Sequence, residues 1–102
     1  SKIKLAGKSG FDYYFDFLIP KSRQKPERLV QAINRPSRQS AEHAVMAWLD
    51  TKENRPADSL AYAIVNDSDE MPKSSFTDAL QTYNVHPLYW SKRTEFVSEL
   101  TM

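Results

Sequence analysis

Apolar and polar residues alternate with a period of two near the start of the chain. Five apolar side chains share one side of residues 11–19: Phe11, Tyr13, Phe15, Phe17 and Ile19. Such alternation predicts a strand with one buried face. Residues 2–5 also alternate, and glycines at positions 7 and 10 lie between the two segments, so we predict a β-hairpin that ends at Pro20.

The next apolar residues recur at helical spacing. Leu29, Val30 and Ile33 follow Pro26, which suits the first turn of a helix, and the pattern predicts a short helix over residues 27–34. After Pro36, either Ser37 or Ser40 can cap a second helix over residues 38–45. Residues 45–51 fit a helix and a strand equally well. We expect the helix to hand over to a strand near residue 45.

The second half of the chain has clearer element boundaries. Residues 60–65 are apolar on both faces, which predicts a central strand, and an acidic loop follows over residues 66–72. Ser75–Asp78 resembles a capping box and predicts a helix that Asn84 closes in the left-handed conformation. Residues 85–90 then predict a strand, in which Pro87 indicates either an edge position or an early strand residue, and Ser91 is predicted to cap a final helix.

The predicted order ββ-α-α-β-β-α-β-α indicates an α/β or α+β fold. We expect one three-layer domain over residues 1–102, with a mixed central sheet of about five strands and flanking helices. The 40% hydrophobic content supports a buried core, and the absence of cysteine excludes disulfides and thiolate zinc sites. No apolar run approaches the roughly 20 residues that span a bilayer. We therefore expect a cytoplasmic protein without a membrane partner.

Charge is distributed unevenly along the chain. Residues 1–38 carry nine Lys and Arg against three Asp and Glu, a balance of +6, whereas residues 39–102 have a balance of −5. A basic first third favours an anionic partner, with Lys21, Arg23, Lys25 and Arg28 as the predicted nucleic-acid contacts. The alternative is that residues 21–25 form a solvated turn.

Asp50 and Lys52 have the spacing of the (D/E)-x-K motif of metal-dependent nucleases. On a strand, these two side chains would share one face. With Asp16 as a second carboxylate, Asp50 would hold Mg²⁺ between strands while Lys52 acts on the phosphate or the attacking water. This order resembles that of the PD-(D/E)xK nucleases, although predicted helices intervene between Asp16 and Asp50. The alternative is a structural role for all three residues.

Six short blocks spread along the chain carry a resemblance to a known family. They are Gly7–Phe11, Phe15–Phe17, Pro26–Leu29, Trp48–Thr51, Tyr62–Asp67 and Trp90–Arg93. In their order and spacing they resemble domain of unknown function 1829, a bacterial and phage family. The resemblance implies the C-terminal part of a longer, often prophage-encoded polypeptide, and it implies no activity. The family pattern accepts Arg as well as Lys at position 52, which weakens a catalytic interpretation of Lys52.

Two functions follow as expectations. The first is an accessory domain of a mobile element that binds another protein or a nucleic acid and needs no cofactor. It depends on the basic first third and on the aromatic side chains beside it. The alternative is a magnesium-dependent nuclease that uses Asp16, Asp50 and Lys52.

Overall fold

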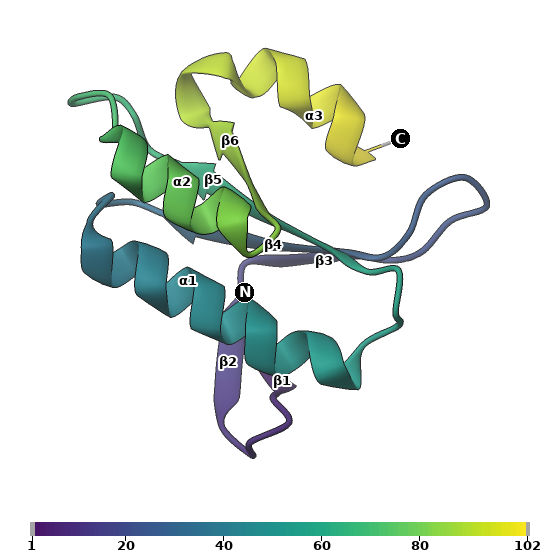
Figure 1. Ribbon diagram of the computed structural model, residues 1–102. Coiled ribbons are helices and arrows are strands. Elements are labelled where there is room, and N and C mark those ends of the chain that lie inside the picture. The colour runs from purple at the N-terminus through teal and green to yellow at the C-terminus, as the bar shows by residue number, and fades with distance from the viewer. Residues whose placement is uncertain (1, 102) are drawn as a thin grey trace.

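The computed structural model describes residues 2–101 (Figure 1). In chain order its elements are β1 (Ile3–Ala6), β2 (Asp12–Phe15), β3 (Phe17–Ile19), β4 (Arg28–Ile33), α1 (Arg38–Thr51), a 3-10 turn (Lys52–Asn54), β5 (Leu60–Val65), α2 (Ser74–Thr82), β6 (Val85–Tyr89), a second 3-10 turn (Trp90–Lys92) and α3 (Arg93–Thr101). Over these residues the fold is α+β, with three α-helices and two sheets.

The main sheet has the strand order β3-β4-β5-β6. β3 runs antiparallel to β4, whereas β4, β5 and β6 are parallel, so the sheet is mixed as predicted. Helices α1 and α2 connect the parallel strands and lie on one face, while α3 crosses the other face (Figure 1). β1 and β2 form a separate antiparallel hairpin. The expected sheet of about five strands is thus a sheet of four strands and a hairpin.

The helix predicted over residues 27–34 is wrong, because these residues form β4. Its first four residues, Arg28 to Gln31, are all buried. β4 pairs with β3 on one side and with β5 on the other, and helices cover both of its faces. A strand that is buried on both faces has no period-two alternation, so its apolar residues can imitate helical spacing.

The single strand predicted over residues 11–19 is also wrong, because the chain bends at Asp16. The Asp16 backbone N–H donates to the Val30 carbonyl at 2.9 Å, and the Asp16 carboxylate accepts the Ala32 backbone N–H at 2.6 Å. The bend moves the chain from the hairpin into the main sheet. It also shifts the alternation by one residue, so that the inward side chains change from odd to even positions, with Leu18 packed against the core and Phe17 exposed.

Helix α1 is longer than predicted. Ser37 caps it in a capping box with Ser40, which confirms one of the two predicted caps. The helix continues through residue 51, so the expected change to a strand near Val45 is wrong. Its buried stripe continues without a break from Ala41 to Thr51. Because three of the buried side chains are alanines, the helix can lie close to the sheet.

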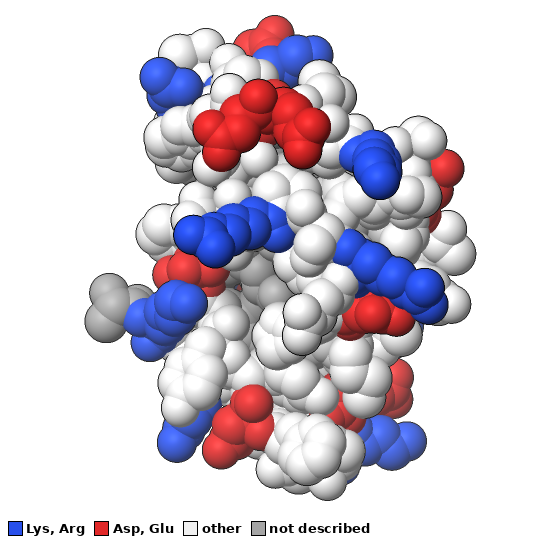
Figure 2. Space-filling model, turned by 90° about the vertical axis from the view of Figure 1, so that its left-hand side faces the viewer, with Lys and Arg blue, Asp and Glu red and all other residues white. Residues whose placement is uncertain are grey.

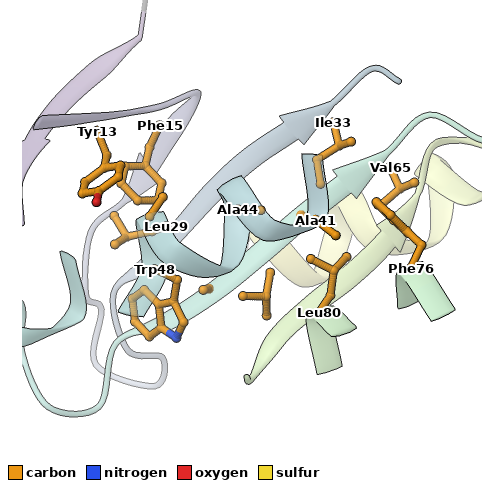
Figure 3. Packing of buried hydrophobic residues seen from close by; sticks show 14 residues of the cluster. Tyr13, Phe15, Leu29, Ile33, Ala41, Ala44, Trp48, Val65, Phe76 and Leu80 are labelled. Atoms are coloured by element: carbon orange, nitrogen blue, oxygen red, sulfur yellow. The ribbon is translucent and has the colours of Figure 1, made fainter. Parts of the chain in front are cut away.

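Two apolar clusters lie on opposite faces of the main sheet. The larger one fills the space between the sheet, the hairpin, α1 and α2. Figure 3 shows Tyr13, Phe15 and Leu29 at one end of this cluster and Val65, Phe76 and Leu80 at the other. The smaller cluster joins Val30 to Phe96 and Leu100 of α3, and half-buried side chains surround it.

In the second half of the chain, most predicted elements are confirmed. β5 occupies residues 60–65, Asn84 has a positive φ of 61°, and β6 is an edge strand that contains Pro87. Two predicted caps are wrong. α2 begins at Ser74 without a side-chain cap, and Ser91 lies in a 3-10 turn, where it bonds to Asp67 instead of capping α3.

Candidate functional site

Asp50 lies near the C-terminal end of α1 and holds the tip of the β1–β2 hairpin. One carboxylate oxygen accepts the Ser9 backbone N–H at 2.8 Å, and the other accepts the Ser9 hydroxyl. The Lys8 backbone N–H donates to the Asp50 carbonyl at 3.0 Å. A negative charge at a helix C-terminus is unfavourable, and these donors compensate for it. Asp50 is therefore the acceptor that fastens the hairpin to the helix.

The surroundings of Asp50 leave little room. A Cβ at Gly7 would collide with the Asp50 carboxylate, so the hairpin needs glycine there. The Ser9 hydroxyl hydrogen bond lowers the pKa of Asp50, although burial opposes that shift. Burial and the neighbouring Asp50 charge raise the pKa of Tyr13. Asp50 is thus ionised and Tyr13 is neutral at neutral pH.

The three residues predicted for a nuclease centre have separate surroundings. Asp50 is helical, so the premise that Asp50 and Lys52 share one face of a strand is wrong. Lys52 lines a shallow hollow of about 560 Å³ with His86. The Asp16 carboxylate accepts a hydrogen bond from the Ala32 backbone N–H, and its other oxygen lies 4.0 Å from the Lys2 ammonium nitrogen. Within residues 2–101 no hydrogen bond or ion pair joins these three side chains, and no cluster of three or more potential metal ligands of the His, Cys, Asp or Glu type occurs.

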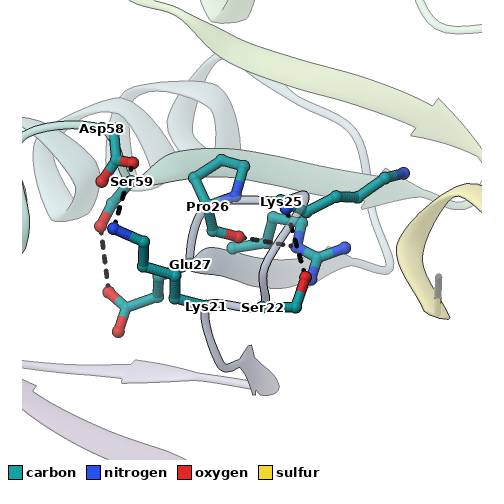
Figure 4. Close-up of polar contacts among 8 residues, drawn as sticks. Lys21, Ser22, Lys25, Pro26, Glu27, Asp58 and Ser59 are labelled. Carbon is teal, nitrogen blue, oxygen red and sulfur yellow. Dashed lines mark hydrogen bonds and ion pairs between the residues drawn. The ribbon is translucent and has the colours of Figure 1, made fainter.

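Three of the four predicted nucleic-acid contacts have partners within the fold, and Figure 4 shows Lys21 beside Asp58. Arg28 is buried, and its guanidinium donates to the Leu100 carbonyl at 3.0 Å. Lys25 donates to the Glu99 carbonyl at 2.9 Å, and Lys21 lies 3.9 Å from Asp58. Residues 21–24 are exposed and the Ser22 backbone N–H donates to the Lys25 carbonyl at 2.9 Å, so the alternative prediction of a solvated turn is confirmed. Through Lys25 this turn also contacts the end of α3. Arg23 is an exposed residue of the same loop.

A second polar cluster, which the sequence did not suggest, joins the residue before β4 to the segment before β5. Arg55 donates to both carboxylate oxygens of Glu27, and the Ser59 hydroxyl donates to the same carboxylate at 3.1 Å. Arg55 lowers the pKa of Glu27, and the carboxylate in turn raises the pKa of Arg55. Because the partners are 28 and 32 residues apart in sequence, no local pattern could reveal them.

A groove of about 970 Å³ opens at the carboxyl ends of β4 and β5. Asn66, directly after β5, donates to the Asn34 carbonyl and side-chain oxygens at 3.3 and 3.1 Å, which ties the two strand ends together. Ala41 of α1 and Phe76 and Ala79 of α2 line the apolar part of the groove. Crevices at the carboxyl ends of parallel strands are common ligand sites in α/β proteins.

Charges of both signs surround this groove. Arg35 and Lys73 are basic, Asp69 and Glu70 are acidic, and none of the four belongs to an ion pair within residues 2–101. A further pair joins Arg38 to Glu42 at 3.5 Å between exposed side chains. The rim charges therefore balance. Figure 2 shows this end of the molecule, where basic and acidic side chains lie interspersed.

The positive surplus of the first third does not form one surface. Lys4 and Lys8 lie on the hairpin, residues 21–25 on the loop before β4, and Arg35 and Arg38 at the groove. The bend at Asp16 separates the hairpin from the loop before β4, and the length of β4 separates that loop from the groove. The charge balance of +6 in residues 1–38 is therefore not concentrated in a single basic surface patch.

Among residues 2–101 no helix has the length and apolar character needed to cross a bilayer. No curated protein and no solved structure matches this chain. Residues 7–93 match the family model described as Domain of unknown function DUF1829, which includes the hairpin tip, the main sheet, α1 and α2. With most of its length inside that match, the chain belongs to the DUF1829 family.

Proposed function

We propose that this domain is a protein-binding module that holds a peptide segment of its partner in the groove at the carboxyl ends of β4 and β5. The observation that carries the proposal is the groove itself, with an apolar lining and a balanced rim of unpaired charges. An apolar side chain of the partner would enter beside Ala41 and Ala79. Its charged neighbours would pair with the rim.

The charges support a protein partner over a nucleic acid. A polyanion is held by several cations that act together and release counterions. Of the four predicted phosphate contacts, Arg28 is buried, and Lys21 and Lys25 are engaged with Asp58 and α3. At the groove, Asp69 and Glu70 would repel phosphate as strongly as Arg35 and Lys73 attract it.

A balanced rim also supports selectivity among peptides. Opposite charges on two sides of a groove favour a ligand with the complementary order of charges, and they penalise the reverse order. Arg35 lies between β4 and α1, whereas Asp69 and Glu70, together with the single cation Lys73, lie in the loop between β5 and α2. The bound peptide should therefore carry an acidic and a basic residue on either side of its apolar anchor.

The test is selection from a displayed library of random short peptides, with the whole chain as bait. We expect enriched peptides to share an apolar residue flanked by opposite charges. The double variant Arg35→Glu/Lys73→Glu should weaken their binding by about tenfold or more, since each lost charge pair costs up to roughly 1 kcal/mol and each reversal adds repulsion. Lys4→Glu/Arg23→Glu is the matched control with the same change in net charge and should bind as the wild type does.

Three outcomes would count against the proposal. They are no enrichment, equal binding by the rim variant, and an equal loss in the control. Labelled DNA and RNA at about 50 mM salt test the other partner class, and tight binding there would replace the peptide proposal. The magnesium-dependent nuclease stays a prediction that the described geometry does not favour. Cleavage by the wild type that Asp50→Asn and Lys52→Ala both abolish would revive it.

A further inference from the structure

The main sheet has two edges that differ in protection. β6 forms one edge and contains Pro87, which has no N–H to offer a further strand. β3 forms the other edge and, within residues 2–101, pairs with β4 alone. The β1 ladder does not extend to β3, because its first pair joins Ile3 to Phe15. Over the part of the chain that the structure describes, the outer side of β3 therefore pairs with no other strand.

Exposed aromatic side chains lie beside this open edge. Tyr14 is 57% exposed and Phe17 is 56% exposed, although both belong to strands. Their neighbours Tyr13, Phe15 and Leu18 point into the main core, so Tyr14 and Phe17 point away from it. An unpaired strand edge that carries an exposed apolar side chain such as Phe17 is a site where another strand can pair.

We propose that two copies of this chain pair through their β3 strands. In an antiparallel arrangement about a two-fold axis at Leu18, Phe17 of one copy lies opposite the partner subunit's Ile19. Both residues are apolar, so the strand is complementary to itself, as a two-fold interface requires. The result is a continuous sheet across the two copies. This inference goes beyond the proposed function and does not depend on it.

The structure also limits how far the pairing extends. The bend at Asp16 and the missing N–H of Pro20 end the ladder on either side of β3. Since both copies use the same edge and the other edge contains Pro87, the pairing closes at two copies. The exposed parts of Tyr14 and Phe17 supply roughly 200 Å² of aromatic surface per copy, well below the roughly 800 Å² of a standard interface. A weak dimer follows.

Sedimentation velocity from about 10 μM to about 1 mM tests this pairing, with dimer expected to appear at roughly 100 μM. Phe17→Lys should keep the protein monomeric over the same range, because a charged edge side chain opposes pairing. Phe11→Lys is the matched control, since Phe11 is 68% exposed and lies outside β3. A wild type that stays monomeric, a Phe17→Lys variant that still dimerises, or an equal loss in the control would overturn the proposal.

Cross-linking gives a second measurement if Phe17→Lys fails to fold. The chain has no cysteine, so a single introduced thiol reports its own neighbours. Leu18→Cys should form a disulfide-linked dimer under mild oxidation, because the two-fold axis brings the two thiols together. Phe11→Cys should not. Equal cross-linking at both positions, or none at residue 18, would contradict a two-fold axis at Leu18.

Discussion

The side chains on the two faces of the main sheet are buried to different extents. On the face toward α1 and α2, the strands contribute fully buried side chains such as Leu29, Ala63 and Val65. On the face toward α3, Val30 is fully buried, but Ile64 and its neighbours are only half-buried. The family match covers the elements of the first face and ends at residue 93, where α3 begins. The deeper burial on the face toward α1 and α2 indicates that this face contributes most of the stability.

The largest expected effect comes from placing a charge on each face at neighbouring positions of β5. Val65→Asp should unfold the domain, because burying an unpaired carboxylate costs several kcal/mol. Ile64→Asp should lower the melting temperature yet leave a folded protein, since its carboxylate can reach water beside α3. Melting curves by circular dichroism decide this. Equal damage from both substitutions would contradict the difference between the faces.

A matched pair of leucines compares the faces without adding charge. Leu80 of α2 is fully buried in the larger cluster, whereas Leu88 of β6 is half-buried in the smaller one. Leu80→Ala should lower the free energy of unfolding by about 2–5 kcal/mol, and Leu88→Ala by less than about 2 kcal/mol. Urea titration gives both values. A larger loss at Leu88 would mean that α3 packs more tightly than its half-buried neighbours suggest.

The fastening of the hairpin to α1 should make stability depend on pH. The folded-state pKa of Asp50 lies below its unfolded value of about 3.9, so its contribution is present above that pH and is lost as pH falls through the lowered value. Asp50→Asn should lower the melting temperature at pH 7 and reduce the loss of stability below about pH 4. Because Glu27 also has a lowered pKa, some acid dependence will persist in the variant.

Two controls make the Asp50 result specific. Gly7→Ala should lower the melting temperature at pH 7 as well, since its Cβ displaces the same carboxylate. Lys52→Gln should leave both the melting temperature and the pH dependence unchanged, because Lys52 is exposed beyond the end of α1. An Asp50→Asn variant with the wild-type acid transition would show that Ser9 and Lys8 do not stabilise the fold through this carboxylate.

The sequence predicts elements well where a local signal decides the conformation. Asn84 tolerates a positive φ, Pro87 restricts β6 to an edge, and Ser37 caps α1, each through its own backbone or side chain. The helix prediction for the residues of β4 was wrong for the opposite reason. Its residues are extended because β3 and β5 pair with it on both sides, and that condition is not visible in residues 28–33.

The candidate site shows the same division. The spacing of Asp50 and Lys52 suggested chemistry, but the partner that decides the role of Asp50 is Ser9, which lies 41 residues away. The groove combines residues from Asn34 to Ala79, and no short motif contains more than one part of it. Tertiary contacts assign these roles, so they could be read only after the strands and helices were placed.

The smallest expected effect lies at the end of α3, where the thinner face is fastened. Lys25 donates to the Glu99 carbonyl near the C-terminus of this helix, where a positive charge is favourable. Since the contact is exposed, Lys25→Gln should lower the free energy of unfolding by no more than about 0.5–1 kcal/mol. The clearer readout is faster amide exchange in residues 96–101 with unchanged exchange in α1. Arg23→Gln removes a charge from the same loop and should change neither, so an equal effect there would show that net charge, rather than this contact, holds α3.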